Sequence, residues 1–166
     1  MTNRMLLLVV DETHASQRAV AYVAGIVGRQ RGLRICLVHI VPRLPPKTLD
    51  SRGAHDWRER KPRARPKDKQ QPWLADAKKA AQRALGMATA ALRAAGVAPS
   101  TLDLQVSERV EGLGAAERIL ELAQARRCDT VVVGRDSMSW FRDLMRGTLA
   151  AELVRRGERY TIWVVA

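Results

Sequence analysis

The sequence predicts an α/β domain built on a parallel β-sheet with helices on both faces. Short apolar runs alternate with segments in which apolar residues recur at helical spacing. This alternation favours parallel strands joined by right-handed helical crossovers. A length of 166 residues suits one sizeable core. We therefore expect a single domain over residues 1–166, doubly wound, with five strands.

The first half of the chain predicts two buried strands joined by a helix. Residues 5–10 (MLLLVV) and 34–41 (RICLVHIV) are continuous apolar runs, typical of strands that are covered on both faces. Between them, Thr13 can cap a helix in which Val20 and Val23 fall at helical spacing, and Gly32 follows that helix.

A basic, proline-rich segment at about 43–72 interrupts the pattern. It has almost no apolar periodicity, and residues 43–71 hold ten Lys or Arg against four acids, half of the net charge of +12. We expect a flexible insertion. Three roles remain open for it: a solvated loop, a patch for nucleic acid or an acidic protein, and a cover that presents cations to a bound nucleotide.

The second half returns to the alternation of helices and strands. Its expected elements are a long helix from Trp73 to Gly96, a half-exposed strand near a sheet edge over 102–106, a helix around 116–123 with Arg126 and Arg127 in its last turn, a buried strand over 130–133, a helix over 148–156 and a last strand over 160–165.

The candidate ligand site lies where the strands end. In doubly wound sheets, ligands bind beyond the carboxyl ends of the strands, which here means Asp11, residues 40–42 and the turn that opens at Gly134. A glycine at a strand end allows close approach to the backbone, and Gly147-Thr148 opens a helix whose free amides favour an anion. Together these features outline a phosphate cradle.

This turn resembles that of the universal stress protein family, whose nucleotide-binding members carry G-x2-G-x9-G-[ST]. The chain has Gly134, Ser137 in place of the middle glycine, and Gly147-Thr148, all at the same spacing. Residues 6–13 (LLLVVDET) and 38–42 (VHIVP) are similar to the ends of the family's first two strands, although the frequent proline is replaced by Val9. The resemblance covers most of the chain except the insertion.

The resemblance implies the strand order 3-2-1-4-5, with Asp11 beside Gly134 where the order reverses. It also implies a stress-response protein that binds ATP, AMP or another adenine nucleotide, with Mg²⁺ as a companion. The implied nucleotide-binding residues are Val9, Val10, Asp11, Ile40, Gly134, Ser137, Gly147 and Thr148. Family members without the glycines do not bind ATP, so the alternative is an interaction module of the same fold that uses its basic insertion.

Several features also have plainer interpretations. Asp11 can help to cap the first helix, and Gly134 and Gly147 can simply lie in turns. His39 and Cys128 suit interior packing. The chain contains no P-loop motif, and Gly112-Leu-Gly114 lacks the third glycine of a dinucleotide fingerprint. No general base is evident in the turn, so we expect a binding protein with at most slow ATP hydrolysis.

Location and assembly are expected from the remaining patterns. No apolar run approaches the roughly 20 residues of a membrane span, and two isolated cysteines fit a reducing cytoplasm best. The last strand, Tyr160 to Val165, is apolar and lies at a sheet edge in this topology. Because such edges are normally covered or paired, we expect a homodimer through it, as the family also implies.

Overall fold

The computed structural model describes residues 4–27, 32–41, 66–108, 113–138 and 148–166. Its strands form one five-stranded sheet in the order β3-β2-β1-β4-β5, and all the pairings are parallel. The predicted fold class and strand order are therefore confirmed. The strands are β1 (Arg4–Val9), β2 (Leu33–Val41), β3 (Leu102–Glu108), β4 (Thr130–Gly134) and β5 (Thr161–Val165).

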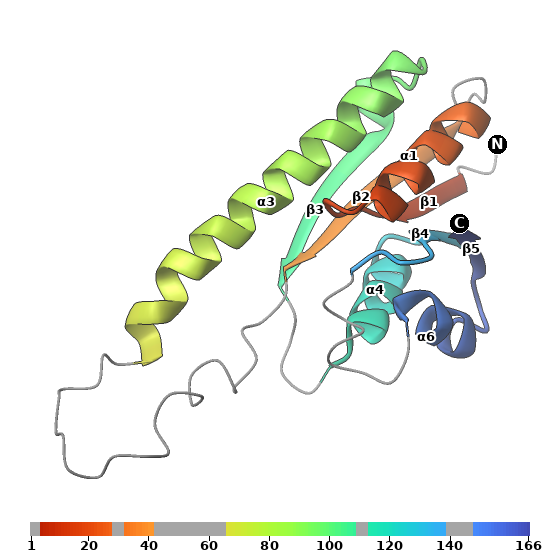
Figure 1. Ribbon diagram of the computed structural model, residues 1–166. Helices are drawn as coiled ribbons and strands as arrows, with labels where there is room; N and C mark the ends of the chain where they lie inside the picture. The colour runs from red at the N-terminus through yellow and green to blue at the C-terminus, as the bar shows by residue number, and fades with distance from the viewer. Residues whose placement is uncertain (1–3, 28–31, 42–65, 109–112, 139–147) are drawn as a thin grey trace, which may run out of the picture.

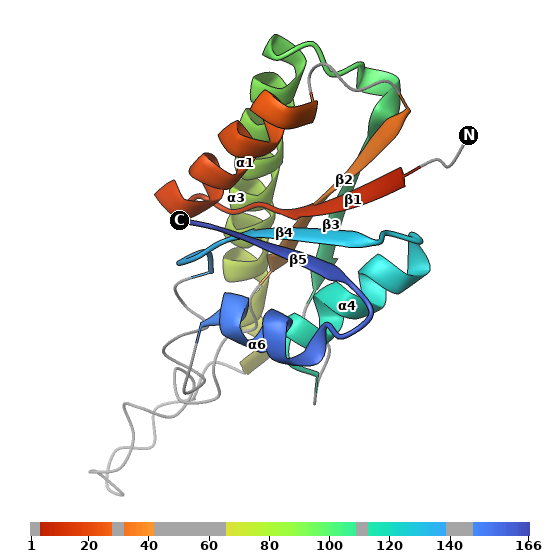
Figure 2. The same cartoon turned by 90° about the vertical axis from the view of Figure 1, so that its right-hand side faces the viewer.

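Helices cover both faces of the sheet (Figures 1 and 2). The described helices are α1 (His14–Val27), α3 (Pro66–Ala94), the short 3-10 helix η1 (Pro99–Thr101), α4 (Ala115–Ala125) and α6 (Leu149–Arg156). One buried cluster joins α1 and α3 to the sheet through Val23, Leu37 and Leu85, and the other joins α4 and α6 through Leu7, Ile119 and Leu153. This two-sided burial explains why β1, β2 and β4 are nearly continuous apolar runs.

Helix α3 begins earlier than the sequence predicts. It starts at Pro66, so residues 66–72 of the expected insertion belong to the helix, while 42–65 lie outside the described residues. Proline suits a first helical position because its missing N–H has no partner there. Pro72, in contrast, lies inside the helix, and its presence made a helical start before Trp73 hard to recognise. The helix extends well past the carboxyl end of β2 (Figure 1).

Helix α4 ends one residue before the predicted cationic turn. Arg126 is its C-cap, and neither Arg126 nor Arg127 lies inside the helix. The Arg126 guanidinium instead donates to Asp103 and Gln105 on β3. The polar residues of this edge strand therefore face α4, whereas Leu104 and Val106 are 49% and 40% exposed. The expected half-exposed edge strand is present.

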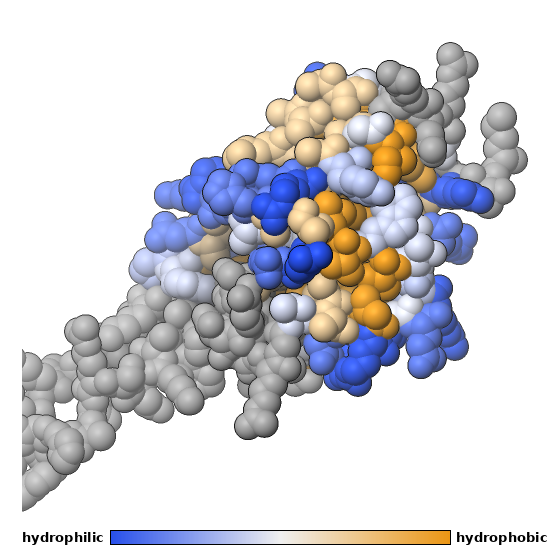
Figure 3. Space-filling model, turned by 45° about the vertical axis from the view of Figure 1, so that its right-hand side comes forward, coloured by the Kyte–Doolittle hydropathy of each residue, from blue (hydrophilic) through white to orange (hydrophobic). Residues whose placement is uncertain are grey.

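Strand β5 forms the other edge of the sheet. None of its residues is fully buried: Ile162, Trp163 and Val165 are half-buried, and Thr161 and Val164 are exposed, Val164 to 40%. In the view of Figure 3, apolar side chains gather on the side of the molecule where β5 lies. Trp163 packs edge-on against Tyr22 of α1, with ring centroids 6.2 Å apart. None of the described helices is long and apolar enough to cross a membrane.

Candidate functional site

Asp11 follows β1 and is tied to the start of α1. The Asp11 carboxylate accepts hydrogen bonds from the Thr13 amide (2.8 Å) and from the Thr13 hydroxyl. The Thr13 hydroxyl in turn caps α1 by accepting from the Ser16 amide at 3.2 Å. The Asp11 amide donates to the Ser16 hydroxyl at 2.9 Å. The interpretation of Asp11 as part of the helix cap is therefore correct, and Ser16 is a member of the site that sequence reasoning missed.

The same carboxylate also reaches across to β4. Its second oxygen accepts a hydrogen bond from the backbone amide of Met138, in the turn after Gly134. Strands β1 and β4 are neighbours where the strand order reverses, so the predicted meeting of Asp11 with this turn is confirmed.

Gly134 has no room for a side chain. A Cβ placed there would collide with the carbonyl group of Ala15 in α1 and lie 2.6 Å from the Ser137 hydroxyl oxygen. The close approach of α1 to β4 therefore requires this glycine even without a ligand. The spacing that suggested a phosphate cradle thus has a packing cause as well.

Ser137 and Met138 complete the described part of the turn. The Ser137 amide donates to the Gly134 carbonyl at 3.1 Å. The Ser137 side chain is only 4% exposed, and its hydroxyl has no hydrogen-bond partner in the structure described here. Met138 is buried and adopts a positive φ of 55°, a conformation that costs energy for a residue with a Cβ. Native structures leave few buried hydroxyls unpaired, and residues in strained conformations cluster at functional sites.

The remaining predicted site residues are divided among different places. Thr148 is the N-cap of α6, and its hydroxyl accepts from the Ala151 amide at 3.2 Å; Gly147 lies outside the described residues. Val9 and Ile40 are buried in the cluster under α4 and α6. Val10 is buried on the opposite face, under α1 and α3. The predicted adenine-lining residues therefore do not share one surface.

His39 is an interior residue, as the plainer interpretation held. Its Nδ1 lies 2.9 Å from the carbonyl oxygen of Val10, and its side chain is buried. Burial lowers the pKa of His39, while the Val10 hydrogen bond and the charges of Asp11 and Glu12 partly oppose that shift. The neutral imidazole thus links β2 to the end of β1 beside the site.

Both cysteines are free and buried. Burial raises the pKa of Cys36, and burial together with the neighbouring Cys36 and Asp129 raises the pKa of Cys128 to about 12. The thiols therefore remain protonated and are poor nucleophiles. Over the described ranges, no group of three His, Cys, Asp or Glu side chains is arranged to hold a metal ion.

A groove of about 240 Å³ opens next to Asp11, between α1 and α3. Val10 and Asp11 line it from the end of β1, and neither Gly134 nor Ser137 does. At this end, Arg83 of α3 donates to the Glu12 carboxylate at 2.9 Å, so the pair connects α3 to the start of α1. Nothing in the spacing of the sequence indicated this groove, because it depends on how two distant helices pack.

Solved structures with the same architecture are found in several organisms. A universal stress protein family member from Burkholderia pseudomallei is 18% identical, with a TM-score of 0.64 over 98% of this chain and 96% of that one. The universal stress protein of Archaeoglobus fulgidus in complex with dAMP is 15% identical, with a TM-score of 0.59 over the whole of both chains. A family protein from Arabidopsis thaliana with AMP bound is 13% identical, with a TM-score of 0.61 over 98% of this chain and 90% of that one.

Identities this low establish the fold and not the ligand. No curated protein matches the chain in sequence. The model of the universal stress protein family, however, matches residues 2–159, which is nearly the whole chain. The chain belongs to the universal stress protein family.

Proposed function

We propose that the chain binds an adenine nucleotide, ATP or AMP, as a regulatory ligand where β1 and β4 meet. The observation that carries the proposal is the unpaired, buried Ser137 hydroxyl next to the Met138 amide, which is held by the Asp11 carboxylate. A phosphate oxygen is an acceptor that would satisfy the hydroxyl. Two structural relatives bind the adenine nucleotides dAMP and AMP, which supports the same ligand class here.

The proposed nucleotide-binding residues keep the roles that the resemblance implies. Gly134, Ser137, Gly147 and Thr148 would hold the phosphates, with Mg²⁺ as their companion because it binds phosphates together with few protein ligands. Val9, Val10, Asp11 and Ile40 would provide the base and ribose pocket. Since Val9 and Ile40 are at most 1% exposed, the base can reach them only if the surrounding side chains move. The described part of the turn holds no histidine or cysteine base, so rapid turnover is not part of the proposal.

Ser137→Ala tests the proposed role of the hydroxyl. We expect this change to weaken ATP binding on the order of tenfold, because a hydrogen bond to a charged phosphate is lost. The free energy of unfolding should stay equal or rise, because the hydroxyl has no partner in the described protein structure. Isothermal titration calorimetry and urea denaturation measure the two effects. Ser100→Ala, at an exposed serine of η1, is the matched control.

Whether the purified protein carries a bound ligand can be tested without choosing the ligand in advance. Freshly purified protein is denatured, and the released small molecules are identified by mass spectrometry. An adenine nucleotide at near-stoichiometric yield supports the proposal. Protein that releases none, and that shows no ATP binding by calorimetry with or without Mg²⁺, would exclude it.

A second candidate rests on the excess charge of the segment 43–71. An interaction module for nucleic acid or an acidic protein would bind polyanions with an affinity that falls steeply as salt rises. Such binding should be lost when residues 47–65 are removed, which leaves the described helix α3 intact. Nucleotide binding that survives the same deletion would separate the two functions.

We also propose that the protein acts in the cytoplasm as a homodimer through β5. The free, buried cysteines are compatible with a reducing compartment. The partly exposed apolar side chains of β5 support pairing at that edge.

A further inference from the structure

Arginine recurs along the amino ends of the strands, at the opposite end of the sheet from the proposed nucleotide site. Arg4 is the first residue of β1, and Arg34 of β2 is paired in register with Met5, the next residue of β1. Arg127 lies just before β4, and Arg159 lies just before β5. We call Arg4, Arg34, Arg127 and Arg159 the arginine row.

Backbone hydrogen bonds hold the starts of these strands side by side. The Asp129 amide donates to the Met5 carbonyl at 3.2 Å, and the Thr161 amide donates to the Asp129 carbonyl at 2.9 Å. These bonds join the starts of β1, β4 and β5, and β2 adjoins β1 on its other side. Neighbouring strands lie about 4.8 Å apart, so the arginine row crosses four strands over roughly 14 Å.

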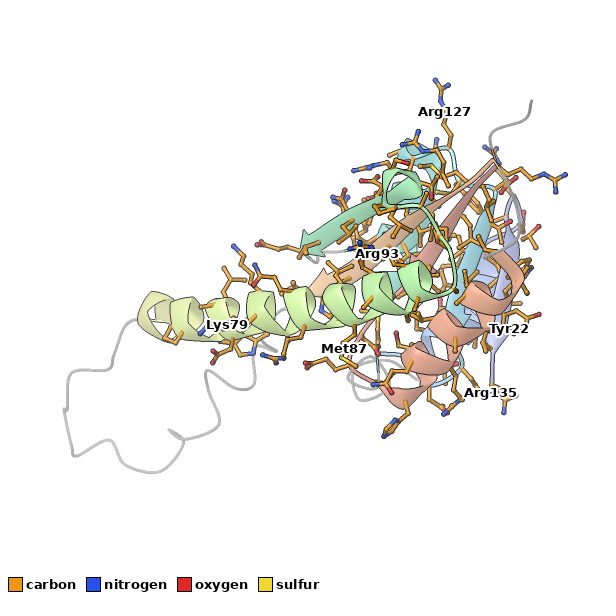
Figure 4. All side chains as sticks on the ribbon, turned by 90° about the horizontal axis from the view of Figure 1, so that it is seen from above. Tyr22, Lys79, Met87, Arg93, Arg127 and Arg135 are labelled. Atoms are coloured by element: carbon orange, nitrogen blue, oxygen red, sulfur yellow. The ribbon has the colours of Figure 1, made fainter. Side chains whose placement is uncertain are left out.

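The side chains of the arginine row are exposed and without acidic partners. All four are exposed, and none forms an ion pair with another described residue, unlike Arg126, which binds Asp103. Figure 4 shows Arg127 extending away from the rest of the molecule. Two exposed acids, Asp129 and Glu158, lie at the same end and offset part of the charge. The row therefore keeps a net positive charge.

Helix ends account for only part of this arrangement. A helix C-terminus favours a cation, and Arg127 follows α4 while Arg159 follows α6. Arg4 and Arg34 belong instead to strands, which have only small net dipoles. Because exposed like charges repel one another, a row of them without partners favours its interpretation as a surface that binds an anion.

The chemistry of the row favours a phosphate backbone as that anion. Every cation in it is an arginine, whose planar fork binds phosphate oxygens in pairs. Single-stranded nucleic acid also requires exposed aromatic rings on which its bases stack, and the row offers none. A duplex carries one phosphate charge per about 1.7 Å of its axis, so a surface of roughly 14 Å lies against several phosphates.

A protein partner fits this end of the sheet less well. Protein interfaces are centred on buried apolar or aromatic anchors. The exposed large apolar side chains of the described residues lie elsewhere: Tyr22, Met87 and Val154 are on helices, Leu104 and Val106 are on β3, and Val164 is near the carboxyl end of β5.

We propose that the arginine row binds the phosphate backbone of a double-stranded nucleic acid without reading its sequence. Contacts to phosphates position a duplex but carry no sequence information. The row lies at the other end of the strands from Asp11 and Gly134, so its binding does not depend on the proposed nucleotide site. It also differs from the segment 43–71, because the arginines belong to the starts of the strands themselves.

A variant that removes three charges from the row tests the proposal; it combines Arg34→Gln, Arg127→Gln and Arg159→Gln. The matched control removes three charges from exposed cations elsewhere that form no ion pair within the described part of the chain, by Arg18→Gln, Lys79→Gln and Arg135→Gln. Substitutions at exposed positions change stability little. Far-ultraviolet circular dichroism and thermal unfolding verify that both variants fold.

Binding is measured by fluorescence anisotropy with labelled DNA and RNA duplexes of one sequence. The unmodified protein should bind with a Kd of about 1–100 μM at about 150 mM salt. The row variant should bind on the order of tenfold more weakly than the control variant. Its plot of log affinity against log salt should also be shallower by about 2–3, because each phosphate contact that is lost releases about one counterion fewer.

The results decide the proposal directly. A selective loss in the row variant supports it for either duplex, and the duplex that binds more tightly identifies the source of the phosphates. Equal affinities for the row and control variants would overturn it, as would an unmodified protein that binds neither duplex. Polyglutamate that displaces the labelled duplex as well as unlabelled duplex does would show that the surface selects an acidic protein, and would also overturn it.

Discussion

At the scale of single residues, Gly134 links the nucleotide motif to the packing of the fold. Gly134→Ala should destabilise the protein by about 1–3 kcal/mol, because the added methyl group is forced against the backbone of α1. The collision is with the Ala15 carbonyl group, which cannot rotate away as a side chain could. Urea denaturation of the purified variant measures the change in the free energy of unfolding.

Gly86→Ala is the matched control for that prediction. A Cβ at Gly86, inside α3, meets no heavy atom within 4 Å. Gly86→Ala should therefore stabilise the protein by about 0.5–1 kcal/mol, since alanine favours a helix more than glycine does. Equal stabilities for the two variants would contradict the argument. Loss of nucleotide binding in a Gly134 variant is, for the same reason, poor evidence for a ligand contact.

His39 gives the fold a specific sensitivity to acid. Burial holds the pKa of His39 below its ordinary value of 6.5, so below pH 6.5 the unfolded chain binds a proton that the native protein does not. Stability should therefore fall as pH drops from 6.5 towards the lowered pKa of the folded state, by at most about 1.4 kcal/mol per pH unit from this residue.

His39→Asn isolates this effect. The asparagine amide can still donate to the Val10 carbonyl oxygen, which His39 contacts in the structure, but it does not titrate. Denaturation at about pH 7.5 and about pH 5.5 should show a smaller acid loss in the variant than in the unmodified protein. Identical losses in the two proteins would mean that His39 is protonated equally in the folded and unfolded states.

At the scale of elements, patterns that depend on burial could be predicted from sequence. Strands β1, β2 and β4 are apolar because helices cover both of their faces, so their position was readable within a residue or so. The end of α3 was readable because Gly96 adopts a φ of 94°, a conformation that favours glycine.

Element boundaries that depend on tertiary contacts were not readable. Helix α4 ends before Arg126 because the backbone turns at Arg127, which has a φ of 54°, a conformation that an arginine does not signal in sequence. The Arg126 guanidinium then binds Asp103 and Gln105 on β3, which are distant in sequence. Helix α3 begins at Pro66, before a second proline that usually argues against a helix. The positive φ of Met138 had no sequence signal at all, since the residue type does not favour that conformation.

At the scale of the whole molecule, topology determined which part of the site was predictable. The reversal of strand order places β1 beside β4, and therefore Asp11 beside the turn after Gly134, whatever the other residues are. The groove between α1 and α3 depends instead on how far apart the two helices pack, and the alanines that line it do not indicate a groove in the sequence. The turn after Gly134 could therefore be predicted from the sequence as a candidate site, and the groove could not.

The two edges of the sheet provide the last prediction, which concerns assembly. If the protein dimerises through β5, Val164→Lys should give a monomer, because a charged side chain on an edge strand opposes pairing with another strand. Val164 is 40% exposed, so the change leaves the core intact. Leu104→Lys on β3, at the opposite edge and 49% exposed, is the control and should remain a dimer. Multi-angle light scattering at micromolar concentration measures the mass of each protein, and an unmodified chain that is monomeric there contradicts the proposed dimer.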